Sequence, residues 1–153
     1  MSAEIDSQPS QPHLDRWLAI LLGVAAFLLY WWTLAPTVLA GDPGEFQFAP
    51  YLLGVTHPTG YPLYSLLGWA WSHLLPMQDL AYRMNLFSAF WAALAVGLLY
   101  PASHSLVRQA LPGLPSTIRR LIAVLAAATF AVTPTFWSQA IIAEVYSLHI
   151  FLV

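Results

Sequence analysis

Two acidic residues and a histidine lie within one short polar stretch of an otherwise apolar chain. The stretch 41–64 reads GDPGEFQFAPYLLGVTHPTGYPLY and contains Asp42, Glu45 and His57. Its prolines and glycines indicate a tightly turned backbone. A carboxylate pair at a membrane boundary is well placed to act as a general base or to bind a cation. This stretch is therefore the first place to look for chemistry.

The spacing of the two carboxylates also has a purely structural interpretation. If Glu45 begins a helix, Asp42 could be its N-cap, with Pro43 at the first helical position and the spacing of a capping box. An aspartate that caps a helix can still present its second oxygen to a substrate. Capping and catalysis therefore both remain open for Asp42.

The hexapeptide HPTGYP, which begins at His57, is a second candidate. Its two prolines fix φ and Gly60 permits a positive φ, so a rigid turn is predicted. This turn could hold His57, Tyr61 and Tyr64 beside Asp42. It could equally be a re-entrant loop that happens to contain a histidine.

Two further ionisable residues lie next to apolar runs. Arg83 could recognise a phosphate with its bidentate guanidinium, or it could be an interfacial arginine paired with Asp79. Glu144 lies at the start of an apolar helix, where ionisable groups are costly and are functional candidates by default. His149 is five residues further on, off the face that an i, i+4 ligand pair would share, so we expect no metal site there.

Composition determines the class of protein. The chain has 153 residues, of which 59% are hydrophobic and only 8% are charged, whereas about 25% are charged in a soluble domain. No soluble fold of this size could bury so much apolar surface, so an all-α, polytopic membrane protein is predicted. A net charge of -2 does not favour nucleic acid binding, and the lack of cysteine excludes a disulfide framework. Sequence patterns for nucleotide hydrolysis or acyl transfer are absent.

Apolar runs predict four membrane spans, at about 17–35, 82–106, 120–137 and 139–153 onward. The third is expected to be kinked or to end near Pro134, and a disordered tail is expected at 1–16. The loop 36–81 should contain a short helix at 46–55 and another at 61–75. The second of these is about 22 Å long, short of the roughly 30 Å hydrocarbon core, so it is interpreted as interfacial or re-entrant. Because the sequence is still apolar at its end, we expect it to be the N-terminal part of a longer protein.

Arginines indicate the orientation. Four of the five fall on one side of this topology: Arg16, Arg108, Arg119 and Arg120. Arg83 falls on the other side. The positive-inside rule places the tail and the 108–120 loop in the cytoplasm and 41–76 outside it. If 61–75 were a span, Arg108, Arg119 and Arg120 would lie on the outer side of the membrane. This is a second argument for an interfacial helix there.

Five blocks of the chain together resemble one family of membrane proteins. The blocks are TLAP (33–36), GDPGEF (41–46), GVTHPTGYPLY (54–64), AYRMNLFSAF (81–90) and AEVYSL (143–148). They resemble bacterial proteins related to the transmembrane-protein-260 type of eukaryotic protein O-mannosyltransferase. These belong to the GT-C class of polytopic glycosyltransferases, which use polyprenyl-phosphate sugars. The resemblance runs from about Trp17 to the end of the chain.

The resemblance implies a GT-C-like N-terminal module in a bacterial inner membrane, acting outside the cytoplasm. A sugar, expected to be mannose, would pass from a polyprenyl-phosphate carrier to a protein hydroxyl or a glycan acceptor. Asp42 would activate the acceptor with help from Glu45, and Arg83 would face the donor phosphate. The substrate-binding residues would be His57, Tyr61, Tyr64, Arg83 and Glu144. A divalent cation could assist, and the chain alone is expected to be inactive because GT-C enzymes have more spans.

A non-catalytic membrane protein is the alternative, such as a transporter subunit or an assembly factor with a polar re-entrant loop. A transporter needs polar residues near the middle of the membrane, and the first three predicted spans contain almost none. This favours the enzyme. The two hypotheses differ in what they expect of Asp42, whose loss should abolish sugar transfer only in an enzyme.

Overall fold

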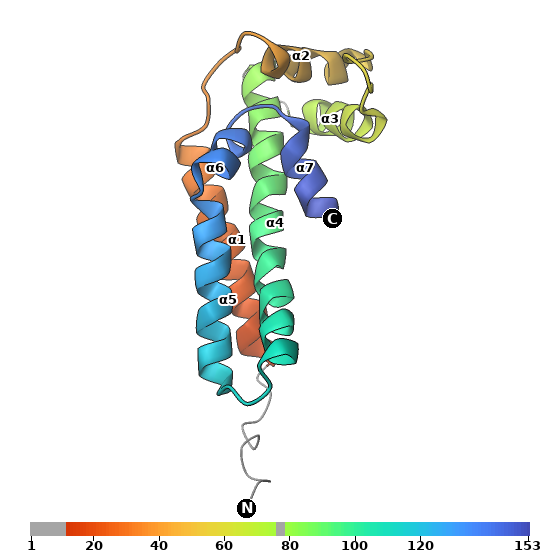
Figure 1. Cartoon of the computed structure of the whole chain (residues 1–153). Helices are drawn as coiled ribbons and strands as arrows, with labels where there is room; N and C mark the ends of the chain where they lie inside the picture. The colour runs from red at the N-terminus through yellow and green to blue at the C-terminus, as the bar shows by residue number, and fades with distance from the viewer. Residues whose placement is uncertain (1–11, 76–78) are drawn as a thin grey trace, which may run out of the picture.

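The computed structural model describes residues 12–75 and 79–153, and each regular element among them is a helix (Figure 1). Three long helices run side by side: α1 (Pro12–Trp32), α4 (Leu80–Ala110) and α5 (Ser116–Ala131). Shorter helices gather toward one end of this bundle: α2 (Asp42–Phe48), α3 (Pro62–Leu74), α6 (Pro134–Ala140) and α7 (Val145–Leu152). A 3₁₀ segment, η1 (Ala49–Leu52), follows α2. The predicted all-α architecture is confirmed.

Two of the described helices, α1 and α4, are long and apolar enough to cross a membrane. A third span results if α5 and α6 are counted together, although they are bent by 63° where they meet. The bend falls just before Pro134, whose ring and missing N–H prevent a continuous helix. The Tyr30 hydroxyl on α1 donates a hydrogen bond to the Ala131 carbonyl at this break, 2.8 Å away. The kink therefore lies where the sequence predicted it.

The first helix begins earlier than expected. α1 begins at Pro12, so the end of the predicted tail is helical, and residues 1–11 lie outside the described part of the chain. Asp15, in the first turn, accepts hydrogen bonds from Tyr100 (2.7 Å) and from Nε of Arg120 (2.9 Å). Contacts with α4 and α5 therefore fix this end of α1. The helix propensities of individual residues do not reveal such contacts.

The last helix begins later than expected. α7 begins at Val145 rather than at Gln139, because 141–144 forms an irregular turn after α6. Polar groups of α4 satisfy the backbone of this turn. The Ala143 N–H donates to Asn85, which replaces the bond that a continuous helix would have made.

Small residues allow α1 and α4 to approach closely. A Cβ atom at Gly23 of α1 would lie 3.2 Å from the Ala93 carbonyl oxygen, and one at Gly97 of α4 would lie 3.2 Å from the Ala19 oxygen. Such contacts are tighter than most real side chains make. Small residues at a helix interface let two backbones approach this closely in a membrane.

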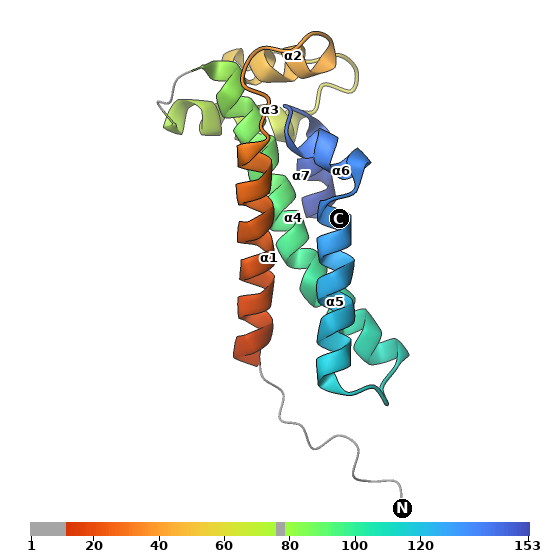
Figure 2. The same ribbon diagram turned by 90° about the vertical axis from the view of Figure 1, so that its left-hand side faces the viewer.

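α2 and α3 lie across the end of the bundle rather than along it, as Figures 1 and 2 show from two directions. α3 has 13 residues, about 20 Å at 1.5 Å per residue, and cannot cross a bilayer core of about 30 Å. It packs where Gly68 meets Met84 of α4 and Pro50 of η1. A short helix is therefore present where the sequence predicts one at 61–75, and its position at a membrane interface stays a prediction.

Candidate active site

Asp42 is the first residue of α2, not its cap. The N-cap is Gly41, whose positive φ of 79° starts the helix one residue early, and Pro43 occupies the first turn. The N–H groups of Gly44 and Glu45 both bond to the Gly41 carbonyl. The capping box considered for Asp42 is therefore wrong. Its carboxylate is exposed and makes no hydrogen bond or ion pair with any described residue.

Glu45 binds the histidine that follows it twelve residues later. Its Oε1 accepts a hydrogen bond from the His57 backbone N–H at 2.7 Å, and its Oε2 lies 2.8 Å from Nδ1 of the same ring. The side-chain bond lowers the pKa of Glu45 and raises the pKa of His57. Both side chains are more than one third exposed, so the pair adds little stability and mainly fixes the position of the ring.

Phe46 supports the histidine from the other side. It is 2% exposed, and its ring makes edge-to-face contacts with His57, Tyr61 and Tyr64 at centroid distances of 5.4, 5.5 and 5.3 Å. Such contacts are favourable beyond the area they bury. Because Glu45 and Phe46 are neighbours at the start of α2, one helical turn supplies both the ion-pair partner and the packing partner of His57.

The turn after His57 has the backbone that its sequence predicts. The Gly60 N–H donates to the His57 carbonyl at 2.9 Å, and Gly60 has φ of 80°. Tyr61 also adopts a positive φ, 38°, directly before Pro62 begins α3. That conformation is unfavourable for a residue with a Cβ and persists only where the surroundings impose it. Tyr61 remains half-buried against Phe46, while α3 carries the chain away.

Glu144 reaches the same site from the far end of the chain. It is 8% exposed, and its backbone N–H and carbonyl both bond to the hydroxyl of Ser88 on α4, at 3.0 and 3.2 Å. Burial raises the pKa of Glu144, and the negative charge of Asp42 raises it further. His57 interacts electrostatically with Glu45, Asp42 and Glu144. The site thus contains an exposed carboxylate beside a buried carboxyl group whose pKa is raised, and such perturbed pairs are candidates for acid–base chemistry.

A buried amide network that we did not predict positions these residues. Asn85 is fully buried, and its Oδ1 accepts hydrogen bonds from Nε2 of Gln47 and from the Ala143 N–H, both at 2.9 Å. Its Nδ2 donates to the Ala35 carbonyl at 2.8 Å. Asn85 therefore joins the irregular segment that leads to α2, α2 itself and the turn that carries Glu144. The available signal was the pair Asn85 and Ser88, two polar residues three apart on one face of an apolar helix.

Two predicted substrate-binding residues have structural partners instead. Nη1 of Arg83 donates to the Ser72 and Leu75 carbonyls at the end of α3, and Asp79 caps α4 through the Ala81 N–H rather than pairing with Arg83. The guanidinium makes no hydrogen bond or ion pair with the acidic residues of the site. Tyr64 is 2% exposed, and its ring packs edge-to-face against Phe46 and Phe87.

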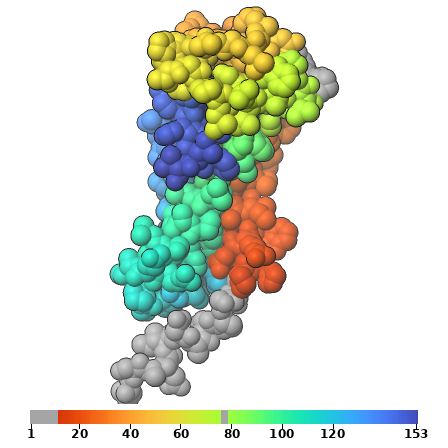
Figure 3. All heavy atoms as spheres, turned by 90° about the vertical axis from the view of Figure 1, so that its right-hand side faces the viewer, coloured from red at the N-terminus to blue at the C-terminus, as the bar shows by residue number. Residues whose placement is uncertain are grey.

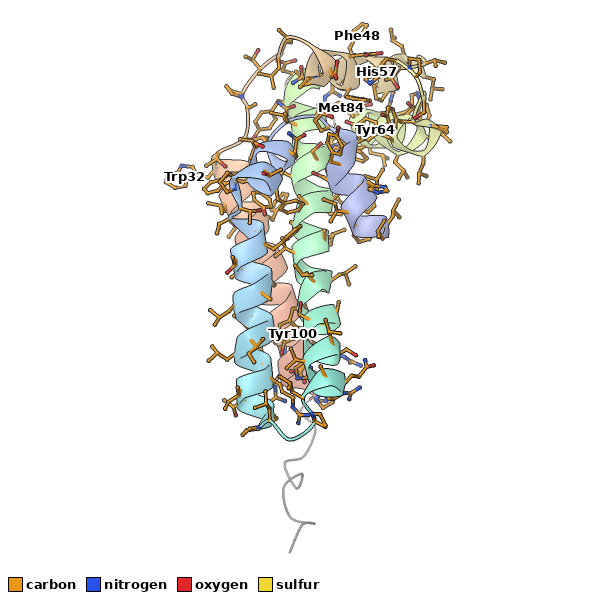
Figure 4. The ribbon with its side chains drawn as sticks, in the orientation of Figure 1. Trp32, Phe48, His57, Tyr64, Met84 and Tyr100 are labelled. Atoms are coloured by element: carbon orange, nitrogen blue, oxygen red, sulfur yellow. The ribbon has the colours of Figure 1, made fainter. Side chains whose placement is uncertain are left out.

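Figure 4 shows how the labelled side chains divide between the two ends of the molecule. His57, Tyr64 and Met84 lie together near α2 and α3, and Tyr100 lies at the opposite end of the bundle. Among the described residues, no group of three histidine, aspartate or glutamate side chains has an arrangement that could hold a metal ion. The residues of the candidate site thus lie at one end of the bundle.

Comparison with known proteins identifies the family of the chain. Residues 42–153 match the family described as the Protein O-mannosyl-transferase TMEM260 N-terminal domain. The chain belongs to this family. The matched region begins at Asp42 and contains every residue of the candidate site. No solved structure gives a significant match to the chain.

Two members of the family illustrate the relationship. Protein O-mannosyl-transferase TMEM260 of Mus musculus is 35% identical over 132 residues, which cover 86% of this chain and 17% of the relative. Protein O-mannosyl-transferase tmem260 of Dictyostelium discoideum is 30% identical over 132 residues, covering 85% of this chain and 15% of the relative. The chain thus spans about one sixth of the length of the curated relatives it matches.

Proposed function

We propose that this chain forms the acceptor-activating part of a membrane O-mannosyltransferase. Mannose would pass from a polyprenyl-phosphate carrier to the hydroxyl of a protein acceptor, outside the cytoplasm. The names of the relatives support the reaction. The observation that carries the residue assignment is the Asp42 carboxylate, which is exposed and unbonded beside the buried Glu144.

In the proposed reaction Asp42 acts as the general base. The acceptor oxygen attacks the anomeric carbon of the sugar while Asp42 takes its proton. The bond from that carbon to the carrier's phosphate oxygen breaks, and the electron pair leaves with the polyprenyl phosphate. Glu45 is engaged by both donors of His57, so its role is to hold the loop. Burial raises the pKa of Glu144, and its carboxyl group is proposed to hydrogen-bond to the bound sugar or acceptor.

Arg83 is proposed as a contact of the donor phosphate only in a second arrangement of α3. In the structure its guanidinium is bound to the carbonyl groups at the end of α3. Binding a phosphate with Nη1 would require it to leave those carbonyls. A donor that repositions α3 would supply the charge-assisted bonds that replace them.

The proposal also includes an orientation in the membrane. Arg16 and Arg108 line one pocket beside Asp15, and Arg120 bonds to that same aspartate. These arginines therefore gather at the end of the bundle away from α2 and α3, where His57 lies (Figure 4). By the positive-inside rule that end faces the cytoplasm, and the candidate site faces outward across a bacterial inner membrane.

The test is sugar transfer by the longest natural form of the protein, since the chain spans about one sixth of its relatives. The protein is reconstituted with mannosyl-labelled polyprenyl phosphate and an acceptor peptide containing serine and threonine. Asp42→Asn is expected to lower the transfer rate by about 100-fold or more, in the range of general-base effects. Asp79→Asn is the matched control, because asparagine caps a helix as well as aspartate does.

Two results would contradict the proposal. Transfer by Asp42→Asn at the wild-type rate, with unchanged thermal stability, would remove Asp42 as the base. Absence of label on any acceptor with the unmodified protein would instead favour a non-catalytic role. The 153-residue chain alone is expected to transfer no sugar.

A further inference from the structure

Two adjoining hollows lie between α1 and α4. A polar pocket of about 250 Å³ occupies the end away from Asp42, and an apolar groove of about 730 Å³ continues along the helices. Both are lined by Ala19, so one opens beside the other. Figure 3 shows α1 and α4 next to each other on this face, and Tyr100, which lines the polar pocket, is labelled in Figure 4. The site is separate from the proposed catalytic residues.

The polar pocket has unsatisfied positive charge. Arg16 and Arg108 line it, both are exposed, and neither makes a hydrogen bond or an ion pair within the described part of the chain. The Asp15 carboxylate also lines the pocket but is already bound by Arg120 at 2.9 Å and by Tyr100 at 2.7 Å. The two free guanidinium groups therefore dominate the charge.

A buried nitrogen in the same pocket also lacks a partner. Nε2 of His104 is inaccessible to solvent and makes no hydrogen bond with the described residues. Its ring stacks on Tyr100, with an interplanar angle of 3°, which holds it in the wall of the pocket. Buried polar atoms normally have a partner. The pocket therefore offers the two exposed guanidinium groups to a ligand that supplies oxygen atoms, while the His104 ring forms part of its wall.

The groove beyond the pocket is suited to hydrocarbon. Its floor is low because Gly23, Ala93 and Gly97 lack large side chains where α1 and α4 meet, and its surface is almost entirely apolar. From Ala19 to Phe27 it follows α1 for about 12 Å at 1.5 Å per residue. A flexible chain lying along the helices would cover it.

We propose that the pocket and groove together bind an anionic phospholipid from the surrounding bilayer. The lipid phosphate would lie between Arg16 and Arg108, near His104, and an acyl chain would lie in the groove. Basic pockets between membrane helices recognise such headgroups. The combination favours this occupant, since a packing helix would need no cations and a free phosphate would need no groove. The proposal stands independently of the sugar-transfer reaction.

The test measures lipid binding to the protein in detergent by native mass spectrometry. Phosphatidylglycerol and phosphatidylcholine with identical acyl chains are titrated separately, and phosphatidylglycerol is expected to bind more tightly. The double variant R16Q/R108Q should weaken phosphatidylglycerol binding by about 30-fold, from roughly 1 kcal/mol per basic residue. The charge-preserving variant R16K/R108K should bind nearly as well as the unmodified protein, because lysine also binds phosphate.

The groove is tested with a second pair of variants. Leu98→Trp places a bulky ring in the groove from its exposed rim and should weaken binding of phosphatidylglycerol. Leu106→Trp is the matched control, since Leu106 is exposed on the same helix but lines neither hollow. Equal effects of the two substitutions would overturn the acyl-chain assignment.

Three further results would overturn the proposal. One is equal binding of the two phospholipids, and another is unchanged binding in R16Q/R108Q. The third is displacement of bound phosphatidylglycerol by a different anion. Inorganic phosphate should not displace it, and polyprenyl phosphate should not displace it at a lower concentration than free phosphatidylglycerol does. Such displacement would assign the pocket to a free anion or to the donor carrier.

Discussion

Replacing Asn85 with alanine should destabilise the fold more than any change at the exposed carboxylates. The substitution removes three hydrogen bonds of 2.8 to 2.9 Å, of which two are buried and the one to Ala35 is partly buried. It leaves the Ala143 N–H, the Ala35 carbonyl and one N–H of Gln47 without a partner. At about 1–2 kcal/mol for each buried unsatisfied group, the free energy of unfolding should fall by about 3–6 kcal/mol. Because Ala143 precedes Glu144, the candidate site should loosen as well.

Thermal unfolding in detergent measures this effect. With about 2–4 °C per kcal/mol for a chain of this size, the Tm should fall by at least about 6 °C. Gln109→Ala is the control, because exposed Gln109 bonds only to Ser105 in its own helix and should change the Tm little. In a double-mutant cycle, Asn85→Ala should cost less once Gln47 is alanine. A Tm shift no larger than that of the control would refute the assigned network.

Two other predictions follow from the loop that carries the site. Gly44→Ala should lower the free energy of unfolding by about 1–3 kcal/mol, because the new Cβ collides with the Leu39 carbonyl, whereas Gly113→Ala meets open space and should be near neutral in the same melts. The bond to Glu45 should stabilise the fold between the lowered pKa of Glu45, below 4.5, and the raised pKa of His57, above 6.5. Stability from Glu45 is lost as pH falls through its folded pKa, and stability from His57 is lost as pH rises through its own. In Glu45→Gln, NMR titration should show the pKa of His57 falling toward 6.5, and an unchanged pKa would contradict the pairing.

The class of fold and the course of the spans follow from local properties of the sequence. Hydropathy over about 20 residues identifies the long apolar helices, and Pro134 breaks a helix wherever it occurs because it lacks an N–H. The run 61–75 is likewise too short for a helix that spans the hydrocarbon core. The helical class, the break before Pro134 and the short helix α3 depend on neighbours in the sequence, which is why they agree with the structure.

The helix boundaries that were wrong depend on distant partners. α1 extends back to Pro12 because Asp15 is held by α4 and α5, and α7 starts late because Asn85 binds the turn before it. The cap of α2 was misassigned by one position, since Gly41 adopts a positive φ that its sequence permits but does not require.

For the candidate site, the sequence determined only which residue types were available. It placed Asp42, Glu45 and His57 in one polar stretch, without indicating which of the carboxylates would be free. The tertiary structure engages Glu45 with His57, leaves Asp42 exposed, and brings Glu144 from about one hundred residues away through Ser88. Hydrogen bonds and burial between segments so far apart depend on how the helices pack, and no local pattern records them.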